Sequence, residues 1–193
     1  MDDIRELELR PVGADEDSED EYDQMNSKGI VQYKKIDELY DIIKVVGAGG
    51  FGIVIACRDR SSNKKFALKI AARYHAHAAS SLRREREMLA QMSHQNIIRV
   101  YEMRREYKNL VIMKMELGKE TVTSLVERHQ RKTGQAGLPE EQCAKIMKGL
   151  FRALAYLHDE QNVIHRDIKP DNIILGSHKD LTRVKLVDFG LAV

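Results

Sequence analysis

A glycine cluster is the first feature of the sequence that could bind a ligand. It comprises Gly47, Ala48, Gly49, Gly50, Phe51 and Gly52 in the spacing G-x-G-x-x-G, with Val54 two residues later. Apolar runs on both sides predict a hairpin between two strands, whereas a dinucleotide-binding loop would lead from a strand into a helix. Because glycines lack side chains, the backbone N–H groups of this hairpin can approach and cover a triphosphate. A purely structural glycine hairpin is the alternative.

A lysine and a glutamate form the second candidate. Lys69 lies in the apolar run Phe66–Ala71, and Glu85 lies on the apolar face of the helix expected to follow. An ionised carboxylate on an apolar face is unfavourable unless it is paired, and Lys69 on the facing sheet is the obvious partner. Such a pair would hold the ammonium group against the α- and β-phosphates of a nucleotide. A lysine at a sheet edge that extends into solvent is the alternative.

Two further motifs near the C-terminal end are more specific. Residues 164–172 have the sequence I-H-R-D-I-K-P-D-N, and the tripeptide D-F-G at 188–190 follows a short strand expected at Val184–Val187. The pattern H-R-D-x-K-P-x-N resembles the catalytic loop of eukaryotic-type protein kinases. Its lysine, two positions after the aspartate, is similar to the serine/threonine branch. The run from Asp167 to Leu175 and the long helix before it resemble calcium/calmodulin-type kinases.

This resemblance implies a role for each polar residue of the two motifs. Asp167 would accept the proton of the attacking hydroxyl, and Lys169 would neutralise the γ-phosphoryl group. Asn172 and Asp188 would bind magnesium, because a hard dication prefers oxygen ligands. The lysine–glutamate pair would complete the catalytic set. The resemblance therefore implies ATP and Mg²⁺ as cofactors and a serine or threonine hydroxyl of a protein as the acceptor.

The resemblance also implies a pocket for the adenosine part of ATP. Val54 and Ala67 would lie above the adenine ring and Ile174 below it. The strand that leads into the hinge would supply the rest of the pocket, with Met113 at the back, Met115 or Glu116 at the adenine edge and Glu120 at the ribose.

A column of apolar residues is expected to join the two lobes of the resembled fold. Its members would be Leu89, Val100, His165 and Phe189. Ordinary core packing is the alternative for these residues and for the adenine pocket, and both interpretations predict burial.

Two positions depart from the resembled family. Lys114 occupies a hinge position where many relatives have Glu, and we expect it to alter the hinge surface only. Gln95 replaces a frequent proline, which should loosen the turn before the fourth strand.

Apolar runs rich in Val, Ile and Leu predict the strands that must position these residues. The expected strands are Tyr40–Val46, Ile53–Asp59, Phe66–Ala71, Ile98–Arg104 and Asn109–Met115. Antiparallel pairing of consecutive strands is the simplest topology for the first three.

Helices are predicted between and after these strands. The first would begin at Ser80 or Ser81 and carry Leu82, Glu85, Leu89 and Met92 on one face. Two more are expected at Thr121–Lys132 and Pro139–Glu160. The fold class is therefore α+β, and the resemblance to protein kinases implies a protein-kinase-like two-lobed fold. It would have a five-stranded antiparallel small lobe with one helix, about residues 40–117, and a partial, mainly helical large lobe, about residues 118–193.

The net charge of +2 conceals a strong asymmetry along the chain. Residues 1–29 contain eleven Asp and Glu against three Lys and Arg, a net charge of −8, so the other 164 residues carry +10. A segment this acidic and poor in apolar residues is expected to be a disordered tail, with the kinase domain at residues 30–193. The tail could fold back onto the basic body as an autoregulatory arm or remain a solvating tail.

The long helix presents an apolar stripe that needs a partner surface. The stripe comprises Cys143, Ile146, Met147, Leu150, Leu154 and Leu157. No activation segment or later large-lobe helix follows Val193, so we expect an incomplete domain whose exposed stripe recruits a partner. Two alternatives to an active enzyme are a catalytically inactive ATP-binding regulatory module and a fragment of a longer kinase.

Composition narrows the remaining classes. Cys57 and Cys143 are too few for a disulfide framework. The dispersed Lys and Arg residues, without aromatic interleaving, argue against nucleic-acid binding. No apolar run approaches a membrane span and no targeting segment is evident, so we expect a cytoplasmic protein, with the nucleus as a possible second location.

Overall fold

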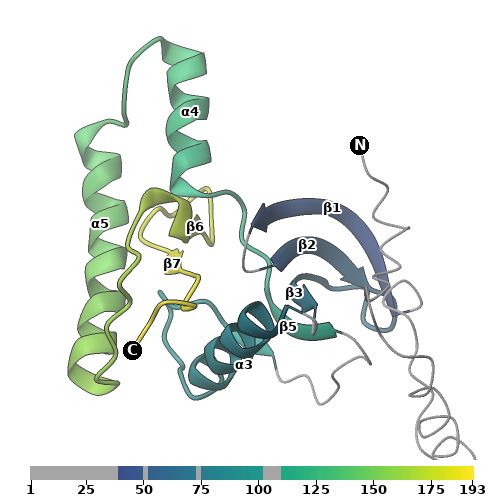
Figure 1. The fold of residues 1–193 in the computed structure, drawn as a ribbon. Helices are drawn as coiled ribbons and strands as arrows, with labels where there is room; N and C mark the ends of the chain where they lie inside the picture. The colour runs from purple at the N-terminus through teal and green to yellow at the C-terminus, as the bar shows by residue number, and fades with distance from the viewer. Residues whose placement is uncertain (1–38, 50–51, 73–74, 102–109) are drawn as a thin grey trace, which may run out of the picture.

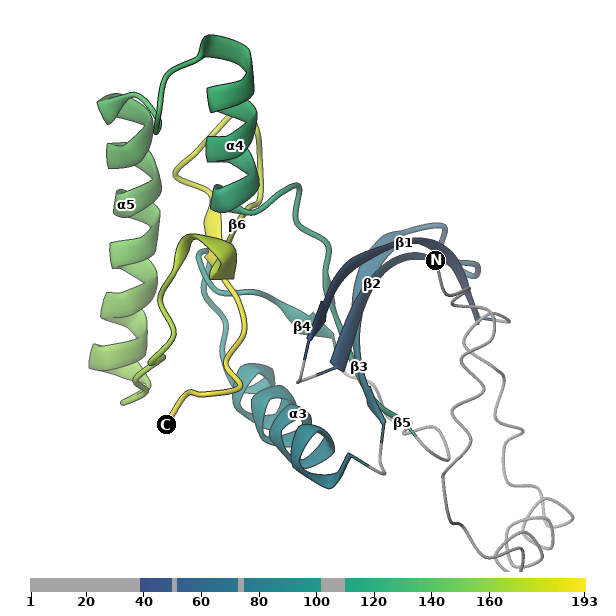
Figure 2. The ribbon, with the colours of Figure 1, turned by 45° about the horizontal axis from the view of Figure 1, so that its top comes forward.

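The computed structural model describes residues 39–49, 52–72, 75–101 and 110–193, which form two lobes (Figure 1). The small lobe contains a five-stranded sheet and helix α3 (Ala76–Ala90), which packs against β3, β4 and β5 (Figure 2). The large lobe contains helices α4 (Val122–Thr133) and α5 (Glu140–Ala155) and a two-stranded sheet. The two-lobed α+β fold expected from the sequence is thereby confirmed. The acidic tail and the tip of the glycine hairpin lie outside the described residues.

The small-lobe sheet is antiparallel throughout, and its strand order is β1-β2-β3-β5-β4. Its strands are β1 (Tyr40–Gly49), β2 (Gly52–Asp59), β3 (Lys65–Ala72), β4 (Val100–Tyr101) and β5 (Leu110–Glu116). Strand β4 begins later than the expected Ile98, because the N–H of Ile98 donates to Leu186 O in the large lobe instead of to a strand neighbour.

Gly52 allows the β1–β2 hairpin to close. Its φ of 116° is a conformation that other residues rarely adopt. A Cβ at this position would also clash with the carbonyl oxygen of Ile70 on β3. The glycine cluster is therefore a hairpin between two strands, as the sequence predicted, and Gly52 has a structural role within it.

Helix α3 begins at Ala76, so the predicted start at Ser80 or Ser81 was wrong. His75 occupies the N-cap position without a side-chain cap hydrogen bond. The alanine-rich first turn has a high helix propensity and extends the helix toward the N-terminus. Both serines lie inside the helix, where Ser80 Oγ donates to His77 O and Ser81 Oγ donates to Gly190 O.

The large lobe begins with a well-capped helix. Thr121 Oγ1 accepts a hydrogen bond from the Ser124 N–H at the start of α4, and Gly134, with a φ of 73°, ends it. Helix α5 ends at Ala155 and continues as a π-helical turn, Tyr156–Glu160, so the predicted long helix comprises two elements.

A short hairpin follows the catalytic-loop motif in the large lobe. It consists of the 3₁₀ turn Pro170–Asn172 and the antiparallel strands β6 (Ile173–Leu175) and β7 (Val184–Leu186). Strand β7 matches the short strand expected at Val184–Val187, except that it ends one residue earlier.

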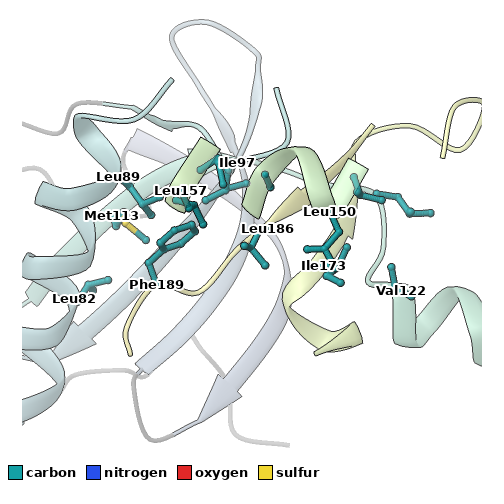
Figure 3. Packing of buried hydrophobic residues seen from close by; sticks show 14 of the residues in the cluster. Leu82, Leu89, Ile97, Met113, Val122, Leu150, Leu157, Ile173, Leu186 and Phe189 are labelled. Carbon is teal, nitrogen blue, oxygen red and sulfur yellow. The ribbon is translucent and has the colours of Figure 1, made fainter. Parts of the chain in front are cut away.

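One hydrophobic core joins the two lobes (Figure 3). It brings α3 and β5 of the small lobe together with α5, β6 and β7 of the large lobe, and it includes Leu82, Leu89, Met113, Leu150, Leu157, Leu186 and Phe189. A second cluster contains Tyr40, Ile55, Cys57, Phe66, Leu68 and Ile112. Both faces of the small-lobe sheet are therefore apolar.

The apolar stripe predicted on α5 was wrong in part. Ile146, Leu150 and Leu157 are buried, because the β6–β7 hairpin packs on this side of the helix. Met147 is 39% exposed and Phe151 is 60% exposed. The open apolar face is thus displaced around the helix from the predicted one.

In the described part of the chain, no helix is long and apolar enough to span a membrane.

Candidate active site

Lys69 and two carboxylates form the centre of the site. Lys69 Nζ lies 2.7 Å from Glu85 Oε2 on α3 and 2.8 Å from Asp188 Oδ1, which follows β7. Although burial lowers the pKa of Lys69, the two carboxylates more than offset this effect and raise the pKa above its ordinary value. The predicted Lys69–Glu85 pair is therefore formed, and the lysine is a buried cation.

Glu85 is held by hydrogen bonds to both of its carboxylate oxygens. Its Oε2 accepts from Lys69, and its Oε1 accepts from the backbone N–H of Phe189 at 3.1 Å. Burial raises the pKa of this carboxyl group, and the Lys69 ammonium opposes that shift. Because α3 thus binds both β3 and the D-F-G tripeptide, the position of the helix determines the position of Asp188.

The catalytic-loop motif forms a second polar group. Asp167 Oδ2 accepts hydrogen bonds from Lys169 Nζ at 2.7 Å and from Asn172 Nδ2 at 2.8 Å. Lys169, followed by Asn172, holds the pKa of Asp167 below its usual value, although partial burial opposes them. The structure brings these three residues together, as expected, and keeps Asp167 ionised at neutral pH.

The same contacts leave oxygen atoms available to a metal ion. Asn172 Nδ2 also donates to the backbone oxygen of Asp167, so both N–H groups of this amide are used and its Oδ1 remains. Among the described residues, hydrogen bonds to Asp188 occupy only Oδ1. A carboxylate oxygen and an amide oxygen are therefore free to bind a hard cation.

His165 connects the two polar groups. Its Nδ1 accepts from the Asp167 N–H at 3.2 Å, so its Nε2 carries the proton and donates to Val187 O at 3.0 Å. The imidazole meets the Phe189 ring edge-on at a centroid distance of 4.7 Å. Burial lowers the pKa of His165 and keeps it neutral. A single buried ring thus fixes the catalytic loop against the D-F-G tripeptide.

The residues expected in a column between the lobes are buried or partly buried, which both a column and ordinary core packing predict. Leu89, His165 and Phe189 are each at most 2% exposed, and Val100 packs against the same core. The structure therefore confirms burial of all three and partial burial of Val100.

Two backbone conformations also mark this region. Arg166 and Asp188 have φ values of 65° and 62°, in the left-handed region that non-glycine residues seldom adopt. Such strain persists only where the surroundings enforce it. Arg166 Nε donates to Leu191 O at 2.6 Å, and Asp188 binds Lys69. Arg166 therefore follows His165 directly in the chain, and Asp188 lies between Val187 and Phe189, both of which contact His165.

The apolar residues expected around adenine lie on adjacent strands. Ala67 pairs with Ala56 on β2 and with Met115 on β5, and Val54 pairs with Lys69. Ala67 is buried, whereas Val54 and Met115 are partly exposed. These residues therefore surround an accessible apolar surface next to Lys69.

Met113 and Ile174 complete the expected set with different degrees of exposure. Met113 is fully buried in the core that joins the lobes, opposite Lys69 on β3. Ile174 on β6 is partly exposed, and its side chain lies so close to Gly118 that a Cβ at that glycine would be 2.5 Å from Ile174 Cδ1. A glycine at 118 therefore allows the backbone after β5 to approach the Ile174 side chain.

The two hinge glutamates already have protein partners. The Glu116 N–H donates to Arg99 O, so a donor role for this N–H at the adenine edge does not fit the structure. Glu120, the predicted ribose ligand, accepts hydrogen bonds from Arg128 at 2.6 and 3.2 Å. Mainly through Arg128, the pKa of Glu120 is lowered. Its role toward ribose stays a prediction.

The expectation for Lys114 was wrong. Its ammonium group lies 2.9 Å from Asp59 Oδ2 and 3.9 Å from the centroid of the Phe66 ring, within the second apolar cluster. Strand alternation places Lys114 opposite Leu68, on the face away from the neighbouring Met113 and Met115. It is therefore a largely buried structural residue and does not shape the hinge surface.

Sequence reasoning missed the residues that join the hinge region to the large lobe. Asn96 Nδ2 donates to Thr182 O and Val184 O, and Lys185 on β7 binds Glu116 at 2.6 Å. A lysine within the apolar run Val184–Val187 was a signal that could have identified the second of these contacts.

Comparison with known families agrees with this geometry. A model of the protein kinase domain matches residues 40–193, which include both polar groups. The chain belongs to the protein kinase family. The family resemblance expected from the catalytic-loop motif is thus confirmed for this kinase domain.

The curated relatives of this kinase domain include a calcium-dependent protein kinase and a serine/threonine-protein kinase. Calcium-dependent protein kinase 4 of Plasmodium falciparum (isolate 3D7) is 32% identical over 161 residues, which are 81% of this chain and 29% of that protein. Serine/threonine-protein kinase DCLK3 of Mus musculus is 30% identical over 168 residues, 86% of this chain and 20% of that protein.

A relative with a different specificity matches equally well. The membrane-associated tyrosine- and threonine-specific cdc2-inhibitory kinase of Drosophila melanogaster is 35% identical over 163 residues, 81% of this chain and 28% of that protein. The chain therefore spans less than a third of the length of each of these three relatives.

Proposed function

We propose that this protein binds Mg²⁺-ATP and transfers the γ-phosphoryl group to serine or threonine hydroxyls of proteins. The observation that carries the proposal is the assembly of two polar groups around His165. One contains Lys69, Glu85 and Asp188, and the other contains Asp167, Lys169 and Asn172. An ordinary solvated loop would not need a buried histidine to align it with a buried lysine–carboxylate pair.

Lys69 is suited to bind the phosphates. Its ammonium group has three N–H donors, of which Glu85 and Asp188 accept two. The third remains for an α- or β-phosphate oxygen, next to the glycine hairpin whose backbone N–H groups would cover the triphosphate. Glu85 keeps the lysine cationic and in place.

The oxygen atoms available as metal ligands at this site are suited to magnesium. Within the described residues, no cluster of three or more His, Cys, Asp or Glu side chains could enclose a metal ion. Mg²⁺ commonly binds through one or two protein oxygens together with phosphates and water, so Asp188 and Asn172 Oδ1 would suffice. When bound there, the ion would offset negative charge on the phosphates.

Asp167 is suited to accept the proton of the acceptor. Its carboxylate is ionised and partly exposed, and Lys169 and Asn172 both bind Oδ2, which leaves Oδ1 for the hydroxyl. The acceptor oxygen would bond to the γ-phosphorus while the bond to the β-phosphate oxygen breaks, and the proton would pass to Asp167. Lys169 would then neutralise charge on the transferred group.

The serine/threonine assignment rests on Lys169. Its ammonium group reaches the catalytic carboxylate directly at 2.7 Å, an arrangement that resembles the serine/threonine branch. The tyrosine- and threonine-specific relative makes the acceptor class a necessary part of the test.

Transfer of labelled γ-phosphate from Mg²⁺-ATP tests the proposal. The substrates are separate serine, threonine and tyrosine peptide pools, and the proteins are the wild-type chain, Asp167→Asn and the matched control Asp171→Asn. Asp171 is exposed in the same loop. We expect Asp167→Asn to lose about 10²- to 10⁴-fold in rate and to keep nucleotide affinity, with Asp171→Asn near the wild type. Nucleotide binding without transfer by the wild type would indicate a regulatory ATP-binding module instead.

A further inference from the structure

Lys185 on β7 bridges three segments of the chain. Its Nζ lies 2.6 Å from Glu116 Oε1 at the end of β5, 3.1 Å from Gln95 O and 3.3 Å from Ile97 O. An ammonium group has three N–H donors, so these three acceptors saturate it. The two side chains are 16% and 24% exposed. Most surface ion pairs are more exposed and contribute little to stability, whereas the Glu116–Lys185 pair is largely enclosed.

Glu116 also has a partner in the loop between α3 and β4. Its Oε1 also accepts from the Arg99 N–H at 2.9 Å, and its own N–H donates to Arg99 O at 3.0 Å. The Glu116 carboxylate therefore joins the loop between α3 and β4 to β5, which is called the hinge strand below. Lys185 adds the large lobe to this junction.

The loop between α3 and β4 is itself fixed to the large lobe. Ile98 N–H donates to Leu186 O, Leu186 N–H donates to Asn96 O, and Asn96 Nδ2 donates to Thr182 O and Val184 O. This loop can thus serve as the pivot between the lobes. Beside the pivot, the Glu116–Lys185 pair is the contact that would have to break for the hinge strand to move away from β7.

We propose that Glu116 and Lys185 form a latch that restrains rotation of the lobes and thereby sets how fast nucleotide enters and leaves the cleft. The effect on nucleotide rests on the proposed function, whereas the restraint on lobe motion does not. Both residues are positioning residues, because they act through the hinge and do not touch the reacting groups.

The lobe motion can be measured without nucleotide by pulsed electron paramagnetic resonance. Cys143 on α5 is exposed and provides a label site in the large lobe, and Lys64→Cys in the exposed β2–β3 turn provides one in the small lobe. Cys57 is buried, and burial raises the pKa of its thiol to about 11, so it should stay unlabelled. The distance between the two labels reports the arrangement of the lobes.

Four variants separate the latch from a general loss of stability. Glu116→Gln keeps the hydrogen bond from Arg99 and removes the charge, and Lys185→Met keeps the aliphatic stem. Lys185→Arg retains a cation. Lys179→Met changes an exposed lysine of the same hairpin and is the matched control.

We expect broader label distances in Glu116→Gln, in Lys185→Met and, to the same extent, in the double variant, because all three lack the same pair. Lys185→Arg and Lys179→Met should resemble the wild type. With a fluorescent ATP analogue, the association and dissociation rates should both rise about three- to tenfold in the broadened variants, the range for loss of a partly buried ion pair.

The two readouts distinguish failure of the latch from failure of the proposed function. Unchanged distance distributions in folded Glu116→Gln and Lys185→Met would overturn the latch. Broadened distributions in a protein that binds no ATP analogue would support the latch and reject the nucleotide function. Broadened distributions with unchanged nucleotide rates would overturn the coupling between the latch and the cleft.

Discussion

One buried and one largely enclosed lysine lie on neighbouring strands of the same sheet and on opposite faces of it. Lys69 on β3 faces α3 and meets the carboxylates of Glu85 and Asp188. Lys114 on β5 lies on the other face and meets Asp59 and the rings of Phe66 and Tyr40. Both have raised pKa values despite burial, so charge alone does not distinguish them.

The two lysines differ in how accessible they and their partners remain to a ligand. The partners of Lys69 come from distant segments that meet at the cleft, and Asp188 is still 35% exposed in its side chain. The partners of Lys114 come from β1, β2 and β3 of its own sheet and enclose it next to two aromatic rings, with the lysine and Asp59 side chains each 15% exposed. A buried cation is thus a candidate for ligand binding when its partners leave it a donor and access, and a structural element when they do not.

Substitution of Lys69 is expected to have the largest effect on stability. Lys69→Met leaves Glu85 buried without its cation, and breaking a buried pair in this way costs about 3 to 5 kcal/mol. Urea unfolding at pH 7.5 measures the change. A loss below about 1 kcal/mol would mean that the Phe189 N–H alone stabilises Glu85.

The second prediction compares how much each member of the Lys114–Asp59 ion pair contributes to stability. Asp59→Asn should cost about 1 to 3 kcal/mol, because Lys114 stays enclosed without its counter-charge. Lys114→Met should be neutral within about 1 kcal/mol, since an apolar side chain of similar shape suits the Phe66 and Tyr40 surroundings. The same unfolding experiment tests both, and equal large losses would show that the ion pair itself stabilises the sheet.

A smaller effect should appear in the pH dependence of stability. Burial lowers the pKa of His165 in the folded state, so the unfolded state binds protons more readily. The stabilisation is complete above the unfolded pKa of about 6.5 and is lost as the pH falls through the lower folded value. Ser61 and Lys114 hold the pKa of Asp59 below its usual value, so its contribution is lost only below about pH 4.

Unfolding free energies between pH 8 and pH 3 test this order. We expect Asp59→Asn to remove part of the decrease below about pH 4 and to leave the decrease near pH 6 unchanged. A change near pH 6 in this variant would show that the two regions are electrostatically coupled.

Sequence predicted the site on the Lys69 side well because its motifs carry order and spacing. An isolated acid on an apolar helix face identified Glu85 and its partner, and the catalytic-loop pattern placed Asp167, Lys169 and Asn172 together. The strands followed from short apolar runs, and the two lobes followed from the family resemblance. These inferences depended on local sequence or on a motif whose members act as one unit.

The surroundings of Lys114, on the other face of the sheet, could not be predicted in the same way. Apolar residues lie on both faces of β5, so periodicity did not show which face Lys114 would occupy. Its partner Asp59 comes from a different strand and carries no motif. The pairing of Glu120 with Arg128, across the start of α4, also has no sequence signature, so sequence alone gave only the role toward ribose that the resemblance implies. On α5, apolar residues extend around more than one face, which left the buried side ambiguous.

Calorimetric titration of Mg²⁺-ATP into the wild type, Lys69→Met and Lys114→Met tests the central claim most directly. The two variants make the same substitution on neighbouring strands of one sheet. We predict that Lys69→Met loses at least about tenfold in affinity, as expected when a charged donor to phosphate is removed, while Lys114→Met binds like the wild type. Equal affinity in all three proteins, or equal loss in both variants, would contradict the assignment of Lys69 as the nucleotide-binding lysine.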